Sequence, residues 1–212
     1  MEQIMHFFTL HGQSLFAAII THIQFVVVSV FFGFIMALLF AVLLSRLPDY
    51  VSDFVLPVLG VFQTIPGLVF IGVLFMYTGM EPITVIIALS VYALFPILKN
   101  TYAGIISVPR VAKEAAKGCG MTNFQILYKV ELPMSLNAIF SGLRMSTIYT
   151  VSWAVLAAMI GLGGLGEFIY RGIETNNQTL ILGGAIPASI LAILFGYIID
   201  FVQKKVTPRG LK

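Results

Sequence analysis

Few side chains in this sequence of 212 residues could act as acids, bases, nucleophiles or metal ligands. The three histidines, His6, His11 and His22, belong to no HExxH metal motif, and the chain has no GxSxG nucleophile motif. The single cysteine, Cys119, excludes a disulfide or a cysteine-based metal site within one chain. These residue types and spacings therefore give no sign of an enzyme.

The glycine-rich stretch 161–166 superficially looks like a phosphate-binding loop. Such loops follow a strand and open a helix, whereas this one follows a long apolar stretch, so nucleotide binding is not expected. Carboxylates are also sparse, because the first one within the long apolar stretches is Asp200, at the end of the last. A proton relay needs titratable groups deep in the membrane, so the sequence disfavours a proton-driven carrier. Sodium coupling through backbone carbonyls stays open.

The composition of the chain indicates that its solvent is largely lipid. Hydrophobic residues make up 59% of it and charged residues 10%, with a mean hydropathy of +1.00, whereas a soluble domain carries about 25% charged residues. The stretches that reach the roughly 20 residues of a transmembrane helix are 19–44, 54–77, 83–106, 136–160 and 179–199. We therefore predict an all-α polytopic membrane protein with about five transmembrane helices.

Positive charge is unevenly divided between the two sides that five helices define. Every Lys and Arg except Arg171 falls on one side, and loops rich in these residues stay in the cytoplasm. The N-terminus is therefore predicted outside, with 1–18 and the histidines at or beyond the outer membrane edge. The C-terminus, with a basic tail 200–212, and the loop 107–135 are predicted inside. Arg144 is expected to extend to the lipid headgroups or to contact this loop.

The loop 107–135 is charged and has the pattern of a folded segment outside the membrane. Ser107 offers an N-cap and Pro109 a residue for the first turn, which predicts a helix over 110–117. Gly118 and Gly120 would end this helix, because glycine adopts the left-handed conformation that closes helices.

A second short helix is predicted from Thr122 and Gln125, which have the spacing of a capping box. The pair Leu132-Pro133 would stop this helix before the stretch 136–160. Two short helices joined by a glycine turn make a rigid projection. Its face at Ala115 and Ala116 lacks bulk, so another protein surface could approach closely.

Two of the apolar stretches are interrupted by proline. Residues 63–67 break the stretch 54–77, and Pro96 breaks 83–106. A proline frees a backbone carbonyl, and non-helical backbone is tolerated in a membrane only where protein or a water-filled cavity covers it. The candidate residues of a translocation pathway are therefore Gln63, Thr64, Pro66, Tyr92 and Pro96. A packing kink without a transport role is the alternative.

The charged loop also resembles a known family in its spacing. The matching residues are Glu114-Ala115-Ala116, then Gly120 after three residues, and Val130-Glu131-Leu132-Pro133 after nine more. This pattern is similar to the EAA loop of permease subunits of bacterial type I ABC importers, with valine where isoleucine is usual, and the resemblance covers roughly 19–199. Stretches 63–66, 92–102 and 161–166 look like the subfamily that imports glycine betaine, carnitine, choline and related osmoprotectants, and are shared in part with methionine-type permeases.

The resemblance implies a division of labour within a larger importer of the bacterial cytoplasmic membrane. Two permease subunits, identical or paralogous, would form the pathway, while two cytoplasmic ATPases would bind ATP and magnesium and drive transport. An extracellular binding protein would deliver the solute. This chain has no Walker A signature, so it would be a multi-pass transport subunit in contact with lipid, with no cofactor, no nucleic acid and no enzymatic activity of its own.

The family's EAA loop docks in a cleft of the ATPase. The residues for which the resemblance implies a coupling role are Glu114, Ala115, Ala116, Gly120, Leu132 and Pro133. The candidate outer surface for the binding protein comprises Gly163, Gly164, Gly166, Glu167 and Arg171, with a merely solvated face as the alternative. Two other functions stay open: the permease of a methionine-type or other amino-acid importer, and an ATP-independent channel or secondary carrier.

Overall fold

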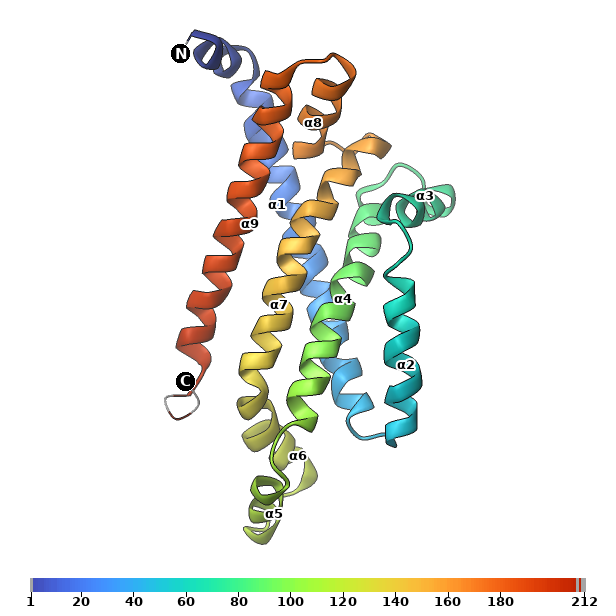
Figure 1. Cartoon of the computed structure of the whole chain (residues 1–212), viewed down its shortest axis with the longest axis vertical. Coiled ribbons are helices and arrows are strands. Elements are labelled where there is room, and N and C mark those ends of the chain that lie inside the picture. Colours follow the sequence, from blue (N-terminus) through green and yellow to red (C-terminus); the bar gives the residue numbers. More distant parts are fainter. Residues whose placement is uncertain (1, 209, 211–212) are drawn as a thin grey trace.

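The computed structural model describes residues 2–208 and 210, with side chains from residue 7 onward. Regular structure in this part of the chain is entirely helical (Figure 1). The elements are α1 (Glu2–Leu44), α2 (Asp49–Phe62), α3 (Gly67–Thr78), α4 (Pro82–Ile106), α5 (Arg110–Gly118), α6 (Asn123–Ile126), a π-helical turn η1 (Leu127–Glu131), α7 (Leu132–Ala154), a 3₁₀ helix η2 (Val155–Ile160), α8 (Leu165–Glu174) and α9 (Gln178–Val206).

Helices occupy all the predicted apolar stretches, but the second stretch is sharply bent. α1, α4, the run from α6 to η2, and α9 are each long and apolar enough to cross a membrane. By contrast, α2 and α3 meet at 87°, so 54–77 is a broken span or a re-entrant loop rather than one straight helix. The break falls at Pro66, which has an extended ψ of 128° and lacks the N–H that would continue the helix.

At two predicted boundaries the helix continues without interruption. α1 runs from Glu2 to Leu44, so residues 2–18 and the stretch 19–44 form a single helix. α9 continues to Val206 and includes the first residues of the predicted tail 200–212, of which residues 209, 211 and 212 lie outside the described part. The two ends of the chain lie at opposite ends of the bundle (Figure 1).

The central helix is α4, which packs most extensively against α1 and α7. Glycines permit the close approach. A Cβ added at Gly33 of α1 would lie 2.9 Å from the Cβ of Ala93, and one at Gly142 of α7 would lie 2.8 Å from the Cβ of Asn100. Small residues serve this purpose in membranes, where lipid provides no hydrophobic force between helices.

The side chains that face away from this packing are large and apolar. Phe16 and Leu39 on α1 and Ile193 on α9 are among the exposed ones, as contact with lipid chains requires. The fold is that of a multi-pass membrane protein.

Replacing Gly142 by alanine tests the contact between α4 and α7. The added Cβ has no room, and overpacking of this kind costs roughly 1–3 kcal/mol. We expect a lower thermal unfolding midpoint for the detergent-purified protein. Gly12→Ala is the matched control, because nothing lies within 4 Å of a Cβ at Gly12. Equal midpoints for the two variants would contradict the packing described.

Candidate functional site

The charged loop begins with a helix, α5, that closes as its glycines predicted. Gly120 has a φ of +77°, a conformation that residues with a Cβ rarely adopt. Its N–H donates to the Lys117 carbonyl at 2.9 Å, and the Met121 N–H donates to the Ala116 carbonyl at 3.1 Å. This pair of bonds is the Schellman motif, so Gly120 turns the chain from α5 towards α6.

The predicted capping box at the start of α6 is confirmed. The Gln125 N–H donates to Thr122 Oγ1 at 3.3 Å, and the Thr122 N–H donates to Gln125 Oε1 at 2.8 Å. Both bonds satisfy amides that the helix leaves without a partner.

Two other local predictions for the loop are wrong. Ser107 is not the N-cap of α5, because its hydroxyl donates back to the Gly104 carbonyl at 2.8 Å and Pro109 occupies that position. Leu132-Pro133 does not stop a helix either, since α6 continues through η1 into α7 and Pro133 lies in the first turn of α7. The helix continues because the wider π turn shifts the hydrogen-bond pattern at the point where Pro133 has no N–H to donate. The loop is therefore continuous with α7.

A buried carboxylate, which lies in the EAA pattern but was given no role by the sequence analysis, ties this loop to the bundle. Glu131 is 1% exposed and accepts bonds from the guanidinium of Arg46, just beyond α1, one of them at 3.2 Å. The ammonium of Lys113, on α5, lies 3.2 Å from the same carboxylate. Glu131 thus joins the end of α1, the helix α5 and the start of α7 at one point.

The sequence offered one signal for this cluster, namely Glu131 standing between apolar residues Val130 and Leu132. Such a charge is costly unless paired. Its partner Arg46 lies 85 residues earlier, so the pairing itself was beyond sequence analysis.

Glu131→Gln tests this connection. Removing one member of a buried ion cluster costs on the order of 3–5 kcal/mol, and the lower half of that range is expected because Arg46 is 43% exposed. Amide hydrogen exchange across 110–118 should become faster in lipid nanodiscs. Glu114→Gln is the control, because its bond to Arg110 is exposed on both sides and is worth about 0–1 kcal/mol. Unchanged exchange in Glu131→Gln would show that the cluster does not hold α5.

The outward surface of the loop differs in part from the predicted one. Glu114 and Ala115 are exposed, and Glu114 pairs with Arg110 at 2.7 Å. Ala116 is buried, so it packs within the loop rather than facing a partner. The most exposed large apolar side chains of the loop are Val111, Phe124 and Tyr128, none of which was predicted. Aromatic residues in a charged segment outside the membrane were the available signal.

At the bend between α2 and α3, the structure brings together three of the candidate pathway residues. Because Pro96 has no N–H, the Tyr92 carbonyl loses its helical donor, and the amide of Gln63 donates to it at 3.0 Å. The Tyr92 hydroxyl in turn donates to the Ile65 carbonyl at 2.6 Å. These two bonds fix the bend to α4. Thr64 and Pro66 lie exposed beside it, and a pathway role for all five remains a prediction.

The glycine-rich loop 161–166 and the start of α8, at the other end of the bundle, contain both buried and exposed residues. Gly161, Gly163 and Gly164 have positive φ, while Gly164 and Gly166 are buried and hold the loop in place rather than forming a surface. Glu167 and Arg171 on α8 are exposed, and Gly163 is half-buried. A contact with a binding protein there remains a prediction.

His22 is fully buried, with Nε2 3.1 Å from the Val151 carbonyl and the backbone of Gly164 beside its ring. It is covered because α8 packs against α1. Its predicted position at the outer membrane edge remains a prediction.

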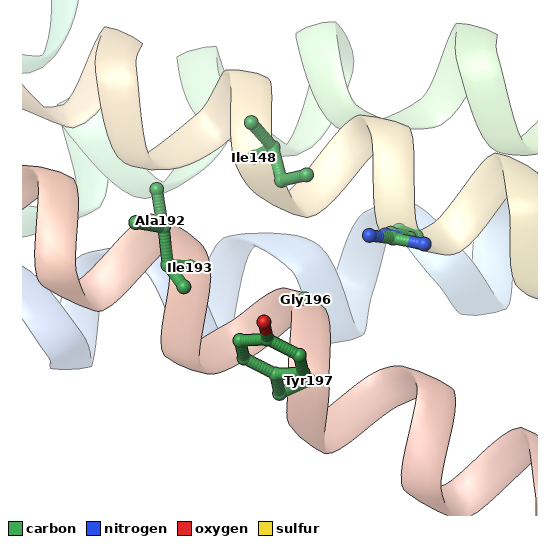
Figure 2. A pocket seen from close by; sticks show the side chains of 6 residues that line it. Ile148, Ala192, Ile193, Gly196 and Tyr197 are labelled. Carbon is green, nitrogen blue, oxygen red and sulfur yellow. The ribbon is translucent and has the colours of Figure 1, made fainter.

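A groove runs between α7 and α9. It is lined by Ile148 of α7 and by Ala192, Ile193, Gly196 and Tyr197 of α9 (Figure 2). Arg144 completes its lining and pairs with Asp200 of α9 at 3.1 Å. Arg144 therefore joins two helices instead of contacting the charged loop.

Comparison with known proteins identifies the fold and the family. A family model described as the inner membrane component of binding-protein-dependent transport systems matches residues 29–211. The chain belongs to this family. The permease is also similar to a solved structure, the inward facing MetNI methionine ABC transporter, with a TM-score of 0.79 at 24% identity, covering 89% of this chain and 94% of that one. The predicted type I ABC importer fold is thereby confirmed, as is a multi-pass transport subunit of the inner membrane.

Curated relatives match the permease over its whole length. The carnitine transport permease protein OpuCB of Listeria monocytogenes is 38% identical over 212 residues, which cover 100% of this chain and 97% of that protein. The glycine betaine/carnitine/choline transport system permease protein OpuCB of Bacillus subtilis is 36% identical with the same coverage.

Proposed function

We propose that this permease forms the translocation pathway of an ATP-driven importer for a quaternary ammonium osmolyte, such as glycine betaine, carnitine or choline. The observation that carries the proposal is the identity of 38% and 36% over the whole chain to permeases named for these solutes. The EAA spacing of the charged loop supports the permease role, while stretches 63–66, 92–102 and 161–166 support the osmoprotectant substrate.

The working importer in this proposal contains further subunits. A second permease, identical or paralogous, completes the pathway, two ATPases bind ATP and magnesium, and an extracellular binding protein delivers the solute. The orientation follows from the positive charges, with the N-terminus outside and the end that carries α5 and α6 in the cytoplasm. Family membership and the projection of these helices beyond the bundle (Figure 1) support this arrangement.

Coupling would proceed through the charged loop. ATP closes the ATPase dimer and draws the two docked loops together, with Ala115, Phe124 and Tyr128 available for contact. Because α6 continues into α7 and Glu131 binds Arg46 and Lys113, a displacement of the loop reaches α7 and α1 together. The pathway opens outward to receive the solute, and hydrolysis resets it.

The two alternatives have less support. A methionine-type or other amino-acid importer rests on likeness of fold at 24% identity and on stretches that are only partly shared with methionine-type permeases. Membership of a binding-protein-dependent transport family argues against an ATP-independent channel or carrier.

Purification from the native membrane tests the proposed function. We expect an ATPase to co-purify with the permease, and its activity in proteoliposomes to rise several-fold with glycine betaine and its binding protein. Accumulation of radiolabelled betaine should require ATP. Recovery of the permease alone, with solute flux in the absence of ATP, would overturn the proposal. Stimulation by methionine instead of betaine would favour the second candidate.

Gly120→Ala tests the coupling role of the loop. A left-handed conformation costs a residue with a Cβ roughly 1–2 kcal/mol, so the turn after α5 should open and uptake should fall at least several-fold while ATP hydrolysis continues. Gly118→Ala is a closely matched control, because neither glycine has an atom within 4 Å of an added Cβ and only Gly120 has positive φ. Equal uptake by both variants at equal membrane abundance would refute the assignment.

A further inference from the structure

A cluster of aromatic rings surrounds the bend between α2 and α3. The ring centroids of Tyr92 and Trp153 are 4.4 Å apart with their planes at 69°, and Phe70 lies 5.6 Å from Tyr92. Phe62 is 5.2 Å from Phe70, and Tyr149 is 6.3 Å from Trp153. The rings come from α2, α3, α4 and α7, so segments distant in the sequence contribute to one aromatic cluster.

The rings differ in their access to the surface. Tyr92 is 2% exposed and its hydroxyl is fixed by the Ile65 carbonyl, so it supports the indole of Trp153 from within. Phe62, Phe70 and Trp153 are half-buried, and Tyr149 is 45% exposed. The outer rings of the aromatic cluster therefore reach the surface of the permease.

Polar residues stand next to these rings in the sequence. The half-buried Gln63, the exposed Thr64 at the bend and the exposed Ser152 of α7 lie next to Phe62, the bend and Trp153 in the sequence. Polar side chains in the middle of an apolar span are costly against lipid and mark faces that meet protein or water. The hydroxyls of Thr64 and Ser152 donate to carbonyls of their own segments, whereas the Gln63 amide reaches α4, so Gln63 is the polar group that favours a protein-facing or water-facing surface at the bend.

No carboxylate occurs in α3, α4 or α7, and the two of α2, Asp49 and Asp53, lie near its start while Phe62 is its last residue. A cation at the aromatic cluster would thus find no fixed negative charge on these helices. The faces of Trp, Tyr and Phe rings attract cations, and quaternary ammonium groups above all, because such groups shed water easily. The attraction is weak compared with an ion pair, which suits a site that must release its ligand.

We infer that Phe62, Phe70, Tyr149 and Trp153, positioned by Tyr92, form a transit site for a quaternary ammonium group within the permease. The identity of the solute rests on the proposed function, whereas the geometry of the aromatic cluster is independent of it. Tyr92 is a positioning residue here, since its ring lies behind Trp153.

Trp153 allows an unusually direct test, because it is the only tryptophan in the chain. Site-specific incorporation of 5-fluorotryptophan at this position gives one ¹⁹F signal from the permease, kept with its co-purifying subunits in nanodiscs. Titration with tetramethylammonium should shift this signal and saturate in the millimolar range. Neutral tert-butanol of similar shape, and sodium chloride at equal ionic strength, should leave it in place.

Ring electronics supply the second measurement. Tetrafluorotryptophan at position 153 withdraws negative charge from the ring face. The dissociation constant for tetramethylammonium should therefore rise roughly 2- to 30-fold, which corresponds to the range of cation–π energies. It is read from intrinsic fluorescence quenching or by calorimetry. Tyr149→Leu should also weaken binding several-fold. Tyr197→Leu is the control, because Tyr197 is likewise exposed but lies on α9.

The outcomes separate the two proposals. If the importer accumulates betaine but the ¹⁹F signal does not shift with tetramethylammonium, the transit site is overturned and the proposed function stays intact. If the permease binds tetramethylammonium but the importer accumulates no quaternary ammonium solute, the transit site stands and the proposed function is overturned. Equal shifts by tetramethylammonium and tert-butanol would show an apolar pocket and refute the cation–π site.

Discussion

Each carbonyl and amide that loses its helical partner inside a membrane must find another, and this constraint governs the arrangement of the permease around α4. Pro96 leaves the Tyr92 carbonyl without its helical donor, and the side-chain amide of Gln63 donates a hydrogen bond to it. The Tyr92 hydroxyl donates to the Ile65 carbonyl at the bend. α4 runs through Pro96 without the predicted break, and its freed carbonyl and the bend between α2 and α3 thereby satisfy one another. The sharp turn between α2 and α3 is stable because of this exchange, and the aromatic rings gather where it places them.

At the end of the bundle that carries α5 and α6, ion pairs rather than backbone hydrogen bonds fix the position of the loop. Glu131 is buried, so its carboxylate holds Arg46 and Lys113 firmly, and α7 begins within the same rigid run. The surface of the loop remains exposed and partly apolar while its base is fixed. A projection of this kind can transmit displacement because it has no soft segment between its tip and the helices that it moves.

Local chemistry made much of this structure predictable. The capping box at Thr122 and the turn at Gly120 depend on residues within a few positions of each other, and the apolar stretches coincide with helices because lipid imposes a minimum length. Pairings across long separations were beyond reach: Arg46 with Glu131, and His22 with Val151. The bend of 87° at Pro66 and the burial of Ala116 likewise depend on neighbours that the sequence does not identify.

The length of α1 has a mechanical consequence. Its 43 residues make a rod of about 65 Å, roughly twice the hydrocarbon thickness of a bilayer. Near one end Phe7 packs on Phe168 of α8, and just beyond the other end Arg46 binds Glu131. Between them Gly33 packs tightly against α4. If α1 pivots about Gly33 as one stiff rod, its two ends move in opposite directions, and narrowing on one side of the membrane would then accompany widening on the other.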